Sequence, residues 1–124
     1  MNKEFIAREL VKSAGENGLV PTLYTVFGKE VRACIPLTKA VCETNVDELD
    51  FSVRASNSLK RAGLFTVGEV ADMIQSADLS HIRNLGKKTE NEIKTRVLNC
   101  GYEHLTSREK LTFFLDLLNK NIIF

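Results

Sequence analysis

The hydrophobic positions near the start of the chain repeat at the spacing of an amphipathic helix. Between residues 3 and 14 the apolar side chains share one helical face, opposite the charged ones; they are Phe5, Ile6, Leu10, Val11 and Ala14. In residues 22–35, β-branched and aromatic residues lie on both sides of Gly28, which favours a short β-hairpin. We therefore expect residues 1–45 to form an N-terminal module of a helix and a hairpin, with a role in packing or partner binding.

A helical pattern returns after residue 46. Ser52 is a predicted N-cap, and Arg54 and Asn57 follow it three residues apart, on one side of the expected helix. Segment 59–70 then aligns with segment 82–93 at a constant offset of 23 residues. Each copy has an apolar residue, a glycine four residues later, and a threonine and a glutamate at successive intervals of three. This threonine–glutamate pair is a capping box, so each copy predicts a turn and a helix start, as in a helix-hairpin-helix.

The turns of the two copies differ in chemistry. The first holds Leu64 and Phe65 and is predicted to pack inward, whereas the second holds Lys87 and Lys88. A helix start with unpaired N–H groups beside two lysines suits a phosphate oxygen. We expect Gly86 to supply a positive φ or a close backbone approach. The alternative is a well-capped turn whose lysines are only solvated.

The C-terminal segment also predicts a helix. Leu111, Phe114, Leu115 and Leu118 form one apolar stripe within residues 103–124, more typical of a core than of an interface. The expected fold is mainly α: a compact bundle of short helices with two helix-hairpin-helix-like elements in residues 46–102. The N-terminal module 1–45 and the terminal helix account for the remaining residues.

Charge and reactive residues limit the functional classes. The net charge is +1, so no global basic field indicates nucleic acid, but residues 82–96 hold five Lys or Arg against two Glu. A cluster of this size is also typical of a solvated surface. The three cysteines and two histidines form no metal or nucleophile motif, so we expect no enzyme, metal site or cofactor. Without an apolar run long enough to span a membrane, a cytoplasmic location is expected.

Two blocks of sequence carry a family resemblance. They read V-D-E-L-D-F-S-V-R-A-S-N-S-L-K-R-A-G and R-N-L-G-K-K-T-E-N-E-I-K. With them, residues 46 to about 102 resemble the C-terminal domain of the bacterial RNA polymerase alpha subunit. The alpha assembly domain is absent, and residues 1–45 do not resemble its end or its linker. The resemblance therefore points to a free-standing domain with its own N-terminal module.

The resemblance implies a helical bundle with two helix-hairpin-helix-like elements. Such a domain binds the minor groove of A·T-rich double-stranded DNA and docks sigma factor and activators. The implied DNA-binding residues are Arg54, Asn57, Gly86, Lys88, Thr89 and Glu92, and those facing sigma factor are Glu48 and Asp50. We expect a non-catalytic DNA-binding module in transcription. The alternative is an interaction module that docks sigma factor, an activator or a second copy in a homodimer, without useful DNA affinity. RNA polymerase is a further expected partner.

Overall fold

The computed structural model describes residues 2–28, 36–76, 79, 82 and 85–121, and it is mainly α-helical. Within these residues no β-strand occurs, which confirms the predicted fold class. None of the described helices has the length and apolarity needed to cross a bilayer. The elements are α1 (Lys3–Asn17), α2 (Leu19–Phe27), α3 (Lys39–Glu43), the 3-10 helix η1 (Val46–Leu49), α4 (Val53–Arg61), α5 (Val67–Ser76), α6 (Lys87–Glu103) and α7 (Ser107–Asn121).

The polypeptide forms two compact units. Residues 1–36 and 105–124 make up the terminal unit, in which α1 packs against α2 and α7. Lys3 Nζ donates to Asn119 Oδ1 at 2.8 Å, so the start of α1 lies beside the end of α7. The buried face of α7 holds Phe113, Phe114, Leu117 and Leu118. The terminal helix therefore contributes to the core, as predicted. Of the predicted stripe, Phe114 and Leu118 are buried, whereas Leu111 and Leu115 are half-buried.

The predicted β-hairpin is wrong over residues 22–27, which belong to α2. Leu19, Thr22 and Leu23 are buried at helical spacing, and this burial outweighs the strand preference of the β-branched and aromatic residues. Gly18, at φ 94°, ends α1 and leads directly into α2. The other part of the expected hairpin, residues 29–35, lies outside the described residues.

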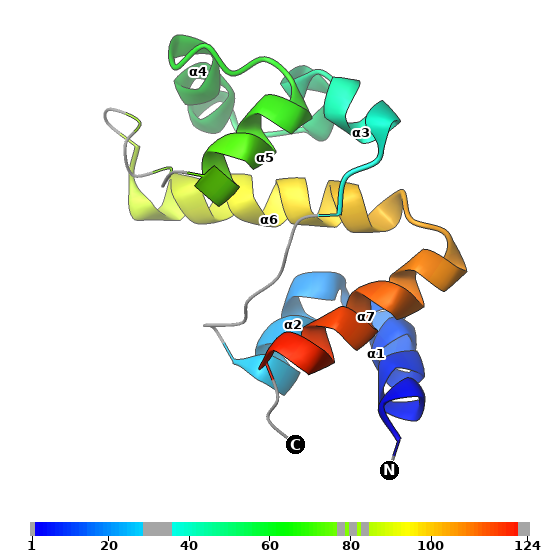
Figure 1. Cartoon of the computed structure of the whole chain (residues 1–124). Helices are drawn as coiled ribbons and strands as arrows, with labels where there is room; N and C mark the ends of the chain where they lie inside the picture. The colour runs from blue at the N-terminus through cyan, green and yellow to red at the C-terminus, as the bar shows by residue number, and fades with distance from the viewer. Residues whose placement is uncertain (1, 29–35, 77–78, 80–81, 83–84, 122–124) are drawn as a thin grey trace. The chain divides into compact units, whose positions relative to one another are not determined.

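Residues 37–104 form the central unit. Helices α3, α4 and α5 lie on one side of the long helix α6 (Figure 1), and α4 and α5 both pack against it. The core of the unit is made of small and branched apolar side chains: Val41, Val46, Ala55, Leu59, Val67, Val70, Ala71, Ile93 and Val97. An isolated antiparallel bridge joins Asn45 to Thr66, which fixes η1 beside the start of α5.

The first copy of the repeat forms the predicted capped turn. Gly63 has φ 80°, a conformation that favours glycine, and Leu64 is buried as expected. Phe65 is 49% exposed, so the prediction that this turn packs inward is wrong for Phe65. Thr66 Oγ1 accepts from Glu69 N at 3.2 Å, and Glu69 Oε1 accepts from Thr66 N at 3.0 Å. Backbone hydrogen bonds from Phe65 and Thr66 lower the pKa of Glu69, because they stabilise the carboxylate.

Candidate nucleic-acid interface

Helix α4 carries the first part of the candidate interface. Ser52 is its N-cap, as predicted, and its hydroxyl accepts from Ala55 N at 3.2 Å. Arg54 and Asn57 are exposed and one turn apart, while Ala55 faces the core. No described residue forms an ion pair or hydrogen bond with either exposed side chain. Both are therefore available to a ligand.

The start of α6 carries the second part. Gly86 is its N-cap and has no side chain that could cap the helix. As at any helix start, the N–H groups of the first three helical residues have no intrahelical partner. Lys87 and Lys88 are exposed there. Gly86 has φ −76°, and an added Cβ would meet no described atom within 4 Å. Neither expected reason for this glycine holds within the described fold.

The second copy of the repeat departs from the first. Because α6 begins at Lys87, Thr89 is its third residue rather than its N-cap, so the predicted capping box of Thr89 and Glu92 is wrong. Thr89 is buried, with 7% of its surface exposed. The carboxylate of Glu92 bonds to Ser52 instead.

The contact between Glu92 and Ser52 joins the two parts. Glu92 Oε2 accepts from Ser52 N and Oε1 accepts from Ser52 Oγ, both at 2.8 Å. Arg54 lies two residues beyond Ser52 on α4, and Lys88 lies one turn, roughly 6 Å along the axis, before Glu92 on α6. The structure thus brings the sequence-predicted residues of both helices to one end of the α4–α6 pair.

Part of the local basic charge is neutralised. Lys94 Nζ lies 3.0 Å from Oε1 of Glu90, whose side chain is 7% exposed. The negative charge of Glu92 lies against the start of α4. Lys87 and Lys88 therefore remain as the available cations at the start of α6 among the described residues. Arg83, also counted in the basic cluster, lies outside those residues.

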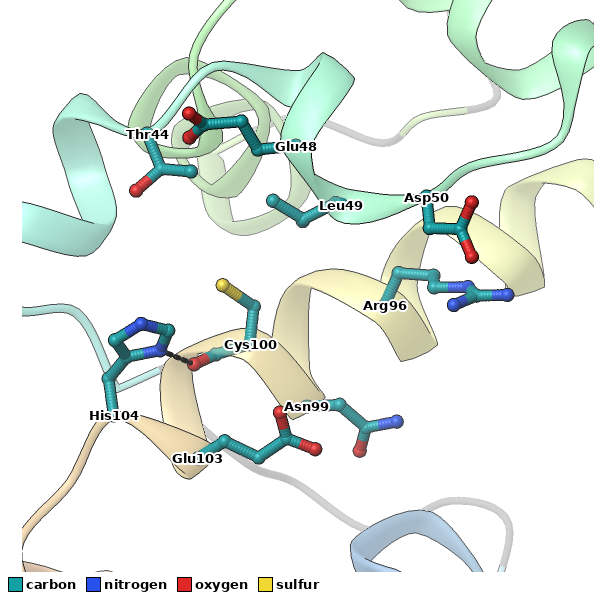
Figure 2. A pocket seen from close by; sticks show the side chains of 9 residues that line it. All are labelled: Thr44, Glu48, Leu49, Asp50, Arg96, Asn99, Cys100, Glu103 and His104. Carbon is teal, nitrogen blue, oxygen red and sulfur yellow. Dashed lines mark hydrogen bonds between the residues drawn. The ribbon is translucent and has the colours of Figure 1, made fainter.

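Glu48 and Asp50 lie at a separate place, a pocket of about 440 Å³ within the central unit (Figure 2). They form one wall with Leu49, and Asp50 takes a left-handed φ of 56°. The other residues that line the pocket are Thr44, Arg96, Asn99, Cys100, Glu103 and His104. Helix α6 forms the opposite wall, and its place in the pocket was not predicted from the sequence. Residues 96, 99, 100 and 103 nevertheless recur at helical spacing and so share a face.

The pocket is rich in hydrogen-bonding and charged groups. His104 Nδ1 donates to the carbonyl oxygen of Cys100 at 2.8 Å, which holds the imidazole at the pocket edge. Burial, and to a lesser extent the charge of Glu103, raises the pKa of the Cys100 thiol. This thiol is therefore protonated at neutral pH. The charged groups that line the pocket are the side chains of Glu48, Asp50, Glu103 and Arg96.

The neighbouring acidic residue Asp47 has a structural role. Its Oδ1 lies 2.7 Å from Lys60 Nζ and accepts from Ser56 Oγ at 3.3 Å. These contacts, with the Lys60 hydrogen bond the largest, lower the pKa of the Asp47 carboxyl. They fasten η1 to α4, which leaves Glu48 and Asp50 as the residues of this acidic run that face the pocket.

A comparison with protein families covers both the candidate nucleic-acid interface and the pocket beside η1. The family model for the C-terminal domain of the bacterial RNA polymerase alpha subunit matches residues 35–99, more than half of the 124 residues. The match extends from before α3 through most of α6, so it includes Arg54, Lys88 and Glu48. No match was found among solved structures. The protein belongs to the family of bacterial RNA polymerase alpha C-terminal domains, whose members are non-catalytic DNA-binding modules of transcription.

Proposed function

We propose that the central unit binds A·T-rich double-stranded DNA through the minor groove in the cytoplasm, as a non-catalytic module of transcription. The observation that carries this proposal is the arrangement of Arg54 and Asn57. Both are exposed and lack described partners, and the Ser52–Glu92 contact holds their helix beside the uncapped start of α6.

Arg54 has the properties needed to read the groove. The minor groove of A·T-rich DNA is narrow and has an enhanced negative potential, which attracts an inserted guanidinium. Its edges present mainly acceptors, with no guanine amino group in the way, so an arginine donor distinguishes A·T from G·C pairs there. Asn57, one turn along the same helix, adds an amide that can donate to the same groove.

The start of α6 supports a phosphate contact. The N–H groups of Lys87, Lys88 and Thr89 lack intrahelical partners, and the positive end of the helix macrodipole lies at the same point. An added Cβ at Gly86 would meet no described atom within 4 Å, and the Lys88 ammonium adds a full charge. Such contacts fix the position of the domain on the duplex without reading sequence.

A binding titration tests the proposal. Fluorescence anisotropy with labelled A·T-rich and G·C-rich duplexes of equal length should show tighter binding to the A·T-rich duplex. Two to three phosphate contacts predict a loss of about 10- to 40-fold in affinity between about 50 and about 200 mM salt. Equal affinity for both duplexes, or affinity that does not change with salt, would contradict minor-groove binding.

A second function is favoured by the pocket beside η1: docking of a sigma factor through Glu48 and Asp50. Both carboxylates line the pocket, and neither is used by a described ion pair, in contrast to Asp47. Glu103 and Arg96 lie on the opposite wall, so three carboxylates face one guanidinium and the net negative charge suits a basic side chain. An activator or a second copy with a basic contact residue is an alternative occupant.

Charge reversal tests this docking function. The double variant Glu48→Lys/Asp50→Lys should bind a purified sigma factor at least about tenfold more weakly, because like charges would then meet at the interface. The control Glu9→Lys/Glu16→Lys changes the charge equally on α1, outside the central unit, and should leave the affinity unchanged. Equal losses in both variants would show a general charge effect and exclude the pocket as the docking site.

A further inference from the structure

We propose that Glu92 is a positioning residue of the DNA interface and makes no direct DNA contact. Its carboxylate ties the start of α4 to α6, which sets the spacing between Arg54 and the start of α6. The consequence for DNA affinity rests on the proposed function. The tie itself can be tested in the absence of DNA.

Two hydrogen bonds join Glu92 to Ser52. Each oxygen of Glu92 accepts a separate donor of Ser52, at 2.8 Å in both cases. The Ser52 hydroxyl donates to Glu92 while it accepts from Ala55 N at 3.2 Å. Ser52 therefore caps α4 and is itself held by a residue 40 positions away. This two-bond contact between Ser52 and Glu92 replaces the local capping box that the sequence of α6 predicts.

The charge of Glu92 opposes a direct contact with phosphate. A carboxylate is an acceptor without a proton to donate, and it repels the anionic DNA backbone. At the start of α4 it also occupies the place that an external anion would take, because it already accepts the Ser52 N–H. At the start of α6 no side chain caps the helix, and the first-turn carboxylate, Glu90, lies 3.0 Å from Lys94 Nζ. The start of α6 is therefore the place for a phosphate.

The position of the tie explains why it matters for binding. Arg54 and Lys88 belong to different helices, and the contact lies within two residues of the first and one turn of the second. Loss of the contact would allow the start of α4 to move relative to α6. Binding DNA would then require both groups to be ordered again, at a cost in affinity.

Four variants separate positioning from direct contact. Glu92→Ala and Ser52→Ala should each weaken binding to the A·T-rich duplex by about five- to tenfold. The double variant should lose less affinity than the product of the two single losses, since both substitutions remove the bond between Ser52 Oγ and Glu92 Oε1. Glu92→Gln keeps an acceptor for Ser52 N and should stay within about threefold of wild type. Glu43→Ala is the control, because it removes an exposed carboxylate of the central unit that has no described partner.

Hydrogen exchange provides the measurement that does not depend on DNA. The Ser52 amide should be protected in the wild type and in Glu92→Gln, and it should exchange faster in Glu92→Ala. Losses of DNA affinity that multiply in the double variant, or an unprotected Ser52 amide in the wild type, would overturn the proposal. If the wild type shows the protection but does not bind DNA, the tie stands and the proposed function fails.

Discussion

Replacing Arg54 with alanine is expected to lower the affinity for A·T-rich duplex about 10- to 100-fold, the largest effect of any single exposed residue. The guanidinium is exposed and has no described partner, so its interactions become available on binding. Hydrogen bonds from a charged donor contribute about 1.5–3 kcal/mol each when the partner would otherwise stay unpaired. Stability should change by less than about 0.5 kcal/mol, because the substitution removes no contact of the fold.

Two variants show whether the effect belongs to the groove or to charge alone. Arg54→Lys keeps the charge but loses the planar guanidinium, so it should recover only part of the affinity. Arg61→Ala removes the same side chain from the last turn of the same helix and should reduce affinity by less than about threefold. Anisotropy titrations at one salt concentration measure all three. An equal loss in Arg61→Ala would mean that α4 acts only through its overall charge.

Replacing Ile93 with alanine is expected to destabilise the central unit by about 2–5 kcal/mol. The side chain is fully buried on α6, next to Glu92, and its truncation leaves a cavity in a small core. Such a loss is a large share of the stability of a domain of this size. Urea denaturation followed by circular dichroism should show a lower midpoint for the affected transition.

Val53→Ala is the matched control for this stability measurement. It removes a branched apolar side chain of the same unit that is 77% exposed, so the free energy of unfolding should change by less than about 0.5 kcal/mol. Similar losses for Ile93→Ala and Val53→Ala would contradict the placement of Ile93 in the core.

Local signals predicted much of the fold. Ser52 caps α4, Thr66 and Glu69 cap α5, and Phe114 and Leu118 of the α7 stripe are buried. Each of these features depends on residues within one or two turns. The start of α6 was missed for the opposite reason. Glu92 follows Thr89 at the spacing of a capping box, yet its carboxylate is used by Ser52, whose approach no local pattern reveals.

The sequence also predicted the local features of the candidate site, but not its tertiary contacts. Spacing placed Arg54 and Asn57 on one side of α4, and the sequence identified Lys87 and Lys88 as cations near a helix start. The contact that brings these helices together and the α6 wall of the pocket depend on tertiary packing. The helix at residues 22–27 was missed because its burial outweighed the strand preference of its side chains.

The two repeat glycines carry different kinds of information for sequence comparison. Gly63 is fixed by a left-handed backbone, so its replacement strains the turn whatever the domain binds. The described backbone does not require Gly86, and an added Cβ would meet no described atom. If Gly86 lies against phosphate as proposed, residue 63 reports on folding among related sequences and residue 86 on DNA contact. A relative that keeps the first glycine and replaces the second would mark a domain that retains this architecture while its selection for DNA contact is relaxed.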